Sequence, residues 1–270
     1  MVVQHNLQAA NTNRQLGITT SAQAKSTEKL SSGYKINRAA DDAAGLSISE
    51  KMRSQIRGLN KASSNAQDGV SLVQTAEGAL NETHSILQRM NELATQAANG
   101  TNTSVDRSAI RAELDQLTSE INRIQSTTQF NTMNLLDGTF SGATNQMKLQ
   151  VGALSGQSID FSIANMCATK IGLKKTLSVS TFTKAGSYMK SVQDAIEVVS
   201  KQRSAMGAIQ NRLEHTIANL DTTSENTQSA ESRIRDTDMA SEMVTYSKNN
   251  ILAQAGQSML ACLLYTSPSP

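Results

Sequence analysis

Apolar residues recur at intervals of three and four positions along a long stretch of the first half of the chain. This alternation has a period of 3.5 residues, which is typical of a helix in a left-handed coiled coil. The pattern predicts a helix over about 43–98, roughly 80 Å long at 1.5 Å per residue. The seam consists of Ile56, Leu59, Ser63, Ala66, Val70, Val73, Glu77, Leu80, His84 and Leu87, so that polar residues interrupt it three times.

A weaker helical pattern precedes this seam. Residues 4–32 carry a thin apolar face on an otherwise polar helix. Such a helix is marginal alone, because helices in proteins gain most of their stability from packing, so it needs a partner. Gly33 can end the helix with a positive φ, and either Asp41 or Asp42 can cap the next one.

After the long helix the pattern changes twice. Thr103 with Asp106 forms a capping-box pattern, which predicts a third helix that folds back antiparallel over a short connection. Alternating apolar residues then predict a β-hairpin, and residues 164–185 show no period and are interpreted as a linker. The third helix has Ile110, Leu114, Leu117, Ile121 and Ile124 on one face, and the hairpin has Met147, Leu149, Val151, Ile159, Phe161 and Ile163.

Helical spacing returns in the last third of the chain. A seam runs from about Ser187 to Ile234, and Asp238 can cap a final helix that reaches about Ala261. We expect the first and last helices to pair, and the others to form a bundle in which neither half of the chain is self-sufficient.

Composition favours long thin helices over a thick globular core. Aromatic residues make up 3% of the chain, Trp is absent, and Pro268 and Pro270 are the two prolines. Large cores rely on aromatic side chains, and prolines further upstream would break helices. The sequence therefore predicts a mainly α fold, a long antiparallel helical bundle or coiled coil built from both chain halves, with a small β-hairpin element.

Charge and hydropathy exclude several classes of partner. The net charge of +2 is too small to favour nucleic acid or an anionic membrane. No stretch of about 18 apolar residues could span a bilayer. The first twenty residues lack the apolar block of a secretory signal peptide, so composition alone indicates a cytoplasmic protein.

The reactive residues do not form a pattern that indicates catalysis or metal binding. Cys167 and Cys262 lack metal-site spacing and are interpreted as incidental thiols. His84 and His215 could face each other across two helices and bind a metal or sense pH, but a packed polar interruption is favoured. Acidic pairs lie at helix starts, where carboxylates cap free N–H groups. We predict no enzyme activity, no cofactor and no metal site.

One stripe on the long helix is open to two interpretations. Arg89, Leu93 and Gln96 stand at i, i+4 and i+7, on the face roughly opposite the seam. An outward Leu among polar residues can mark an interaction site. Alternatively, the stripe belongs to a second packing face, because Ile86, Met90, Leu93 and Ala97 also have helical spacing; the pattern alone favours this second interpretation.

Several stretches together resemble the bacterial flagellins, the subunits of the flagellar filament. The resemblance implies a structural protein that self-assembles into the filament for motility and performs no catalysis. It also implies export in unfolded form through the flagellar secretion apparatus with an export chaperone, a filament cap as partner, and an extracellular location. The matching stretches include LSSGYKINRAADDAAGLSIS, TTQFNTMNLLDGTF, AIQNRLEHTIANL and SRIRDTDMASEMVTYSKNNILAQAGQSMLA.

The resemblance also bears on the ambiguous stripe. LQRMNELATQAANGTN is similar to the flagellin segment recognised by toll-like receptor 5 of vertebrate hosts. It places Arg89, Leu93 and Gln96 on receptor-contact positions and Glu113 on another. It implies further that neighbouring subunits bury the same surface in the filament, so that the two uses compete.

The expected domains follow from these patterns and from the resemblance. We expect an N-terminal polymerisation helix at 1–35, the N-terminal half of a helical rod with the hairpin at 36–163, a linker replacing the family's variable domain at 164–185, the C-terminal half of the rod at 186–235, and a C-terminal polymerisation helix at 236–261. The tail at 262–270, CLLYTSPSP, departs from the family and is expected to end the helix and weaken polymerisation. The alternatives are a hook–filament junction protein and a secreted coiled-coil adhesin.

Overall fold

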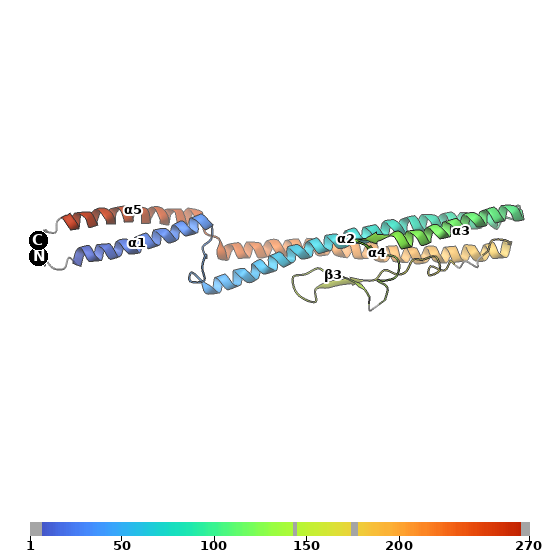
Figure 1. Cartoon of the computed structure of the whole chain (residues 1–270), viewed down its shortest axis with the longest axis horizontal. Helices are drawn as coiled ribbons and strands as arrows, with labels where there is room; N and C mark the ends of the chain where they lie inside the picture. Colours follow the sequence, from blue (N-terminus) through green and yellow to red (C-terminus); the bar gives the residue numbers. More distant parts are fainter. Residues whose placement is uncertain (1–6, 143–144, 174–177, 266–270) are drawn as a thin grey trace. The chain divides into compact units, whose positions relative to one another are not determined.

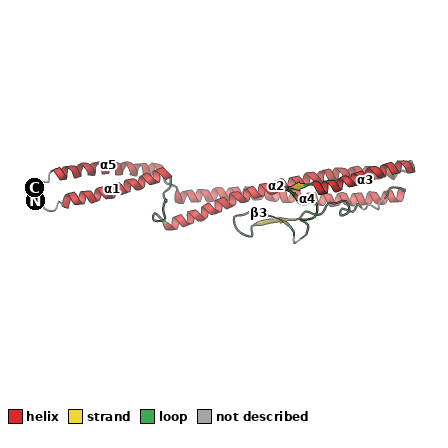
Figure 2. Cartoon of the chain, in the orientation of Figure 1, coloured by secondary structure: helices red, strands yellow, loops and turns green. Residues whose placement is uncertain are grey.

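The long helix that the apolar spacing predicts over 43–98 is α2, Ala43–Ala97. It is seen in a computed structural model that describes residues 7–142, 145–173 and 178–265. Contacts divide the chain into a bundle unit, Arg57–Ser224, and a terminal unit that combines Met1–Ile56 with Glu225–Pro270. Figure 2 shows that helices make up most of the described chain, beside two small pairs of strands. The predicted mainly α fold, built from both halves, is confirmed.

Three helices build the bundle unit. α3 (Ser104–Thr127) and α4 (Phe182–Arg235) lie beside α2 (Figure 1), and side chains from all three meet in one core. The seam residues Val73, Leu80 and Leu87 lie in this core, and the earlier ones Leu59 and Ala66 lie in two smaller clusters with α4, as the 3.5-residue period predicts for one buried face. The largest fully buried side chains include Leu80, Leu87, Met90, Ile121 and Met206.

The polar interruptions of the seam have partners. Ser63 Oγ donates to Asp221 Oδ1 at 2.9 Å, and Glu77 Oε1 lies 3.6 Å from Arg203 Nη2. Both pairs join α2 to α4, and they show that the two helices run antiparallel, since the partner's number falls as that on α2 rises. A polar pair at a fixed position in a seam disfavours other registers, because a shift would leave its members unpaired.

The predicted β-hairpin is present as β3 (Met147–Gln150) and β4 (Ser158–Phe161), which pair antiparallel. It packs on α2 where Gly69 has no side chain: a Cβ there would lie 2.3 Å from Leu149 Cδ1. Asn65 Nδ2 also donates to the carbonyl of Gln150 at 3.2 Å. A two-stranded hairpin is barely stable alone, so this docking holds it in place.

A second strand pair was not predicted. β1 (Gln129–Phe130) and β2 (Met133–Asn134) are joined by a two-residue turn. Its residues Asn131 and Thr132 have φ values of 47° and 64°. Two-residue turns with positive φ at both positions usually have the sequence Asn-Gly, so Asn-Thr was only a weak indication of a hairpin.

The segment 164–185, which shows no period in the sequence, packs against the bundle. Its buried apolar residues join the same core as those of α2 and α3. Helix α4 begins at Phe182 and not near Ser187 as expected, and residues 174–177 lie outside the described part of the chain. The buried residues of the segment are Met166, Ala168, Ile171, Leu173, Val179 and Ala185.

The terminal unit contains the predicted pair of terminal helices, α1 (Leu7–Ser32) and α5 (Met239–Tyr265). The two helices lie side by side (Figure 1), and Lys29 Nζ lies 3.5 Å from Glu242 Oε2 between them. The expected start of the first helix at residue 4 falls outside the described residues. Helix α5 is thus the packing partner that the thin apolar face of α1 needs.

The connections of the terminal unit are tied together. Gly33 has a φ of 74° and ends α1, and the backbone N–H of Lys35 donates to the Arg235 carbonyl at 2.7 Å. Two guanidinium groups lie over the ring of Tyr34, with the Cζ atoms of Arg53 and Arg235 at 5.8 and 4.7 Å from its centroid. Cation–π contacts of this kind stabilise the crossing of the α1–α2 and α4–α5 connections.

Local capping chemistry agrees with the sequence at the starts of α2, α3 and α5. Asp42, and not Asp41, caps α2, since its Oδ1 accepts the N–H of Gly45 at 2.9 Å. The capping box of Thr103 and Asp106 is present at α3. Asp238 caps α5, because its Oδ1 accepts the N–H groups of the second and third residues after it. These carboxylates satisfy N–H groups that a helix leaves free.

The predicted end of the last helix is wrong, like the predicted start of α4. The final helix was expected to end near Ala261, but α5 continues to Tyr265. The residues Cys262 to Tyr265 contain no helix breaker, and the prolines come later, at 268 and 270. Residues 266–270 of the expected anomalous tail lie outside the described part.

Amide hydrogen exchange should separate the two units. α1 buries Ala9 and Ser26, and α5 buries Ala253, whereas six of the ten seam residues of α2 are buried and the other four are half-buried. Local opening is easiest where few apolar contacts hold a segment, so we expect exchange in α1 and α5 to be roughly 100-fold faster than at 56–95 in the monomer. Mass spectrometry of exchanged peptides measures this. Equal protection in the three helices would contradict the difference in packing.

The buried tyrosine of α4 should make the bundle unit less stable at high pH. Burial raises the pKa of Tyr188 from its usual value near 10 to about 12, and a hydrogen bond with Thr118 opposes the rise. Between these values the unfolded chain loses the phenol proton while the folded chain keeps it, so this group's contribution to stability is complete below pH 10 and is lost as the pH rises towards 12. Tyr188→Phe should therefore make the urea midpoint fall less steeply between pH 10 and 12 than it does in the parent. Parallel curves for the two proteins would refute the assignment.

Candidate functional site

A cluster of charged side chains joins α2 to α3 on the surface of the bundle unit. Arg89 Nε and Nη2 both donate to Glu113 Oε1, at 3.2 and 3.0 Å, and Arg89 Nη1 donates to Glu92 Oε2 at 3.2 Å. The hydrogen bonds to Glu113 and then to Glu92 raise the pKa of Arg89 above its usual range. The guanidinium remains about half exposed, so it can still reach a partner.

Leu93 does not lie on the surface. Its side chain is 2% exposed and belongs to the core of the bundle unit. The outward-facing interpretation of Leu93 is therefore wrong for this structure. Helix α3 covers that face of α2, so α2 packs through a second apolar stripe as well as through its seam. Ile86, Met90 and Ala97 pack there as well, as the alternative interpretation expected.

The other predicted contact residues are exposed. Gln96 stands two turns after Arg89 on α2, and Glu113 pairs with Arg89 from α3. Residues seven apart on a helix share a face, so these three side chains form one surface, which we name the polar patch. The structure therefore brings together three of the four predicted contact residues.

Sequence reasoning missed Arg107, which closes the end of the bundle unit. Its guanidinium donates to the carbonyls of Ala97 at 3.1 Å, Asn99 at 3.2 Å and Ser180 at 3.4 Å. The last carbonyls of a helix lack partners within it, and a basic side chain can satisfy them. Here that side chain comes from the next helix, so spacing along α2 gave no sign of it.

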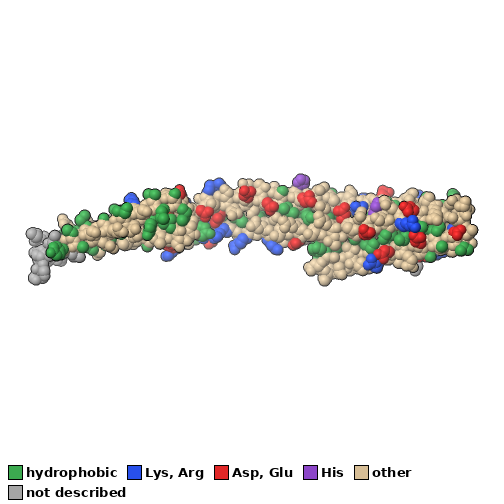
Figure 3. Space-filling view, turned by 90° about the horizontal axis from the view of Figure 1, so that it is seen from above, with side chains coloured by type: hydrophobic (Ala, Val, Ile, Leu, Met, Phe, Trp, Pro, Cys, Tyr) green, Lys and Arg blue, Asp and Glu red, His purple; other side chains and the backbone are tan. Residues whose placement is uncertain are grey.

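A second candidate surface covers the terminal helices. Most of the exposed large apolar side chains in the described chain lie on α1 and α5. Figure 3 shows apolar side chains along this pair on the face in view, with few charged ones among them. We name this the terminal-pair surface; it comprises Leu7, Ile18, Met239, Met243, Val244, Ile251, Leu252, Met259 and Tyr265.

The apolar residues of α5 point in all directions around the helix. Ala253 is its one buried apolar residue among those described, while Val244 and Ile251 are 70% and 67% exposed. A soluble helix normally has a polar outer face, and one that is apolar all round is usually buried on all sides. The spacing of apolar residues suggested a helix here, but it did not indicate that α1 leaves most of it uncovered.

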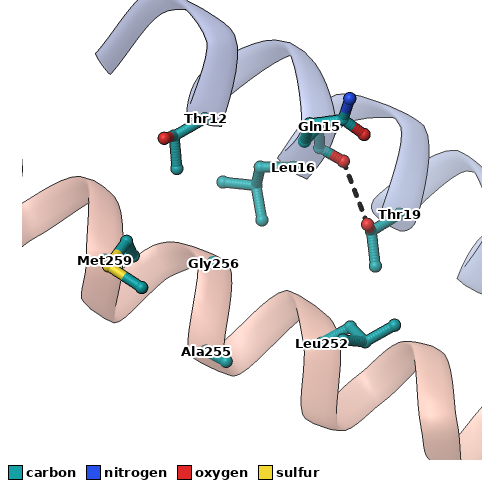
Figure 4. A pocket seen from close by; sticks show the side chains of 8 residues that line it. All are labelled: Thr12, Gln15, Leu16, Thr19, Leu252, Ala255, Gly256 and Met259. Carbon is teal, nitrogen blue, oxygen red and sulfur yellow. Dashed lines mark hydrogen bonds between the residues drawn. The ribbon is translucent and has the colours of Figure 1, made fainter. Parts of the chain in front are cut away.

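A groove runs between the two terminal helices. Figure 4 shows Leu16 of α1 pointing towards Gly256 of α5, between Leu252 and Met259. The space measures about 410 Å³ and is lined also by Thr12, Gln15, Thr19 and Ala255. Thr19 Oγ1 donates to its own helix at the Gln15 carbonyl, 2.9 Å away, so the lining offers mainly apolar contacts.

The residues considered for metal binding do not come together. His84 accepts from Gln88 on its own helix at 3.1 Å. The pairing of Glu77 with Arg203 and of Ser63 with Asp221 places His215 roughly 25 Å from His84 along the bundle, at 1.5 Å per residue. The described residues hold no group of three or more His, Cys, Asp or Glu side chains arranged for a metal, and neither Cys167 nor Cys262 forms a disulfide. None of the described helices is long and apolar enough to cross a membrane.

Comparison with known families matches both ends of the chain. Residues 3–141 match the bacterial flagellin N-terminal helical region, and residues 189–266 match the bacterial flagellin C-terminal helical region. Together these regions contain the polar patch and the terminal-pair surface.

Individual relatives agree with this match. The chain is 53% identical over 262 residues to a flagellin of Halalkalibacterium halodurans, covering 97% of this chain and 95% of the relative. It is 49% identical over 272 residues to the flagellar filament 31.3 kDa core protein of Treponema maltophilum, with the same coverage. Among solved structures, Bacillus cereus flagellin superposes with a TM-score of 0.52 at 30% identity, over 58% of this chain and 88% of that one.

Proposed function

This chain belongs to the bacterial flagellin family, and we propose that it is a structural subunit that joins its copies through the terminal-pair surface to form the extracellular flagellar filament. The proposal assigns it no catalytic role. Contacts between different surfaces of successive copies do not close on themselves, and such contacts generate filaments.

The observation that carries this proposal is the exposure of α5. Val244 and Ile251 are directed to solvent. Burying them against another copy would stabilise the assembly by about 25 cal/mol per Å² of apolar surface removed from water. A contiguous apolar surface of this kind marks an interaction site. A second copy of the same helix pair offers the same apolar surface in return.

Seeded growth tests the proposal. Purified chain is mixed with short filaments obtained by shearing its own salt-induced polymers, and growth is followed by electron microscopy and by the fall in soluble protein. We expect the seeds to lengthen at the expense of the subunit. A hook–filament junction protein would instead bind seed ends and stop growth, and an adhesin would leave seeds unchanged; either result would overturn the proposal.

Family membership also supports partners that act before and during assembly. We infer that an export chaperone covers the terminal-pair surface of the unassembled chain, that the flagellar secretion apparatus carries the chain out of the cell, and that a filament cap guides its addition. A partner has to bind an apolar surface this large in the cytoplasm, because subunits that expose it would otherwise aggregate.

We further propose that toll-like receptor 5 of vertebrate hosts recognises the polar patch of the free subunit. Support comes from the similarity of residues 87–102 to the recognised flagellin segment and from the exposure of Arg89, Gln96 and Glu113 on one surface. Arg89 presents a planar fork that can pair with a carboxylate or with carbonyls.

Arg89→Ala should weaken binding to the receptor ectodomain by roughly 30-fold, as expected for an arginine at the centre of an interface. Arg89 is exposed, so helicity and the urea midpoint should change little. Binding titration and circular dichroism on the same samples measure both.

Arg111→Ala is the matched control, because Arg111 is a similarly exposed arginine on α3 paired with Asp115. It should bind like the parent. Equal losses for the two variants, or none for Arg89→Ala, would remove the polar patch from the proposal. Leu93→Ala is unsuitable as a contact test, since its buried side chain holds the bundle together.

A further inference from the structure

The turn between α2 and α3 contains the sequence Asn99-Gly100, and both residues are exposed. They follow the last residue of α2, so the helix does not fix their backbone. Asn is one of the residues that degrade chemically in proteins. Its side-chain amide can be attacked by the backbone nitrogen of the next residue when that nitrogen is accessible and little hindered.

Gly100 meets both requirements. A Cβ added at this position would find no atom within 4 Å, and the glycine itself places no side chain beside the attacking nitrogen. Its backbone N–H has no hydrogen-bond partner in the described structure, whereas the neighbouring N–H groups of Asn99 and Thr101 donate to Gln96 and Asn99. The nitrogen is therefore free to lose its proton to solvent and react.

The surroundings of Asn99 favour the same reaction. The side-chain Oδ1 accepts the N–H of Thr101 at 3.5 Å, which draws electron density from the carbon under attack. The backbone carbonyl of Asn99 accepts from Arg107 Nη2 at 3.2 Å. A guanidinium this close stabilises the negative charge that develops during the attack.

From this geometry we propose that Asn99 is a site of spontaneous modification, at which Gly100 N closes a five-membered imide ring on the Asn99 side chain. The bond between Gly100 N and Asn99 Cγ forms, the bond from Cγ to the amide nitrogen breaks, and that nitrogen leaves as ammonia with the proton from Gly100. Water then opens the imide at either carbonyl. The products are an aspartate or an isoaspartate at position 99, and no electron donor or acceptor takes part.

The products change the end of the bundle unit. Either one places a new carboxylate after the last turn of α2, where the negative end of the helix dipole disfavours it. That carboxylate competes with the carbonyls of Ala97 and Asn99 for the guanidinium of Arg107. The isoaspartate also adds one atom to the backbone of the turn. We therefore expect the modification to loosen the contacts that tie α2 to α3.

The neighbouring Asn102-Thr103 pair is an internal control in the same turn. The N–H of Thr103 donates to Asp106 Oδ2 at 2.9 Å in the capping box, and the Asn102 side chain donates to the carbonyl of Gln96. Thr103 is also β-branched, so it crowds the attacking nitrogen. Asn102 is half-buried whereas Asn99 is exposed, and with its neighbouring N–H bonded it should be protected.

The experiment incubates the folded full-length chain in mildly alkaline buffer at body temperature and samples it over weeks. Peptides prepared at mildly acidic pH are separated and quantified by mass spectrometry, and an isoaspartyl methyltransferase reports the isoaspartate. We expect Asn99 to be converted at least about tenfold faster than Asn102, and Gly100→Ala to slow the conversion by about tenfold, because the added Cβ restricts the turn.

Either of two results for the folded chain would overturn the proposal. One is conversion of Asn99 at the rate of Asn102 in the folded chain, and the other is an unchanged rate in Gly100→Ala. A sample kept in urea distinguishes the contribution of the fold: conversion of Asn99 only in urea would show that the folded turn protects it, against the geometry described. Circular dichroism confirms that Gly100→Ala is folded before its rate is compared.

Discussion

The double variant Val244→Glu/Ile251→Glu should remain a folded monomer and should not grow filaments from seeds. Both side chains are exposed in the subunit, at 70% and 67%, and stand seven residues apart on one stripe of α5. Assembly would have to bury two carboxylates without partners. We expect this to raise the subunit concentration needed for growth by on the order of 100-fold or more, which corresponds to about 3 kcal/mol.

Val105→Glu provides a control with a matched side chain. Val105 is 73% exposed, like Val244, but lies at the start of α3 in the bundle unit, where an acidic residue suits the helix dipole. It should assemble nearly as the parent does. Efficient growth of the α5 double variant would show that this stripe is not a subunit contact. Loss of helicity in that variant would show instead that the two residues hold the subunit together.

Leu213→Ala should lower the free energy of unfolding of the bundle unit by about 2–5 kcal/mol, the range for truncating a buried leucine. Leu213 of α4 is fully buried and packs with Ala66 of α2 and with Val151 and Ile159 of the hairpin region. The cavity would therefore touch all three elements. We also expect faster amide exchange in β3 and β4, because the hairpin depends on this contact.

Leu154→Ala makes the same truncation in the turn of the hairpin, where the side chain is 67% exposed. It should change the free energy of unfolding by no more than about 0.5 kcal/mol. Urea unfolding followed by circular dichroism compares the two. Similar midpoints for both variants would mean that the three elements do not depend on Leu213.

Local signals in the sequence predicted most of the fold. A period of 3.5 residues fixed α2, alternation at Met147 and Leu149 fixed the hairpin, and the capping residues marked the helix starts. These features depend on near neighbours in the chain, so spacing is sufficient to identify them. The pairing of the terminal helices also followed, because α1 is too weakly apolar to stand alone.

The errors arose where distant elements decide the outcome. The resemblance placed Leu93 on a receptor-contact surface, although the pattern of α2 alone favoured a second packing face, and the structure buries Leu93 on the face of α2 that α3 covers. Arg107 was missed because it satisfies carbonyls of another helix. The spacing pattern did not indicate the terminal-pair surface, which entered only through the resemblance as two polymerisation helices, because an apolar residue looks the same in the sequence whether its partner is in the same chain or in another copy.

The interleaving of the two units constrains the order in which the chain can fold. The terminal unit draws its parts from both ends, with the whole of Arg57–Ser224 between them. Bringing such distant segments together costs loop entropy before any contact offsets it, and contacts of high sequence separation slow folding. We therefore expect the bundle unit to form first and α1 to find α5 last. A chain released gradually from its N-terminus would have to wait for almost its whole length before either unit could close.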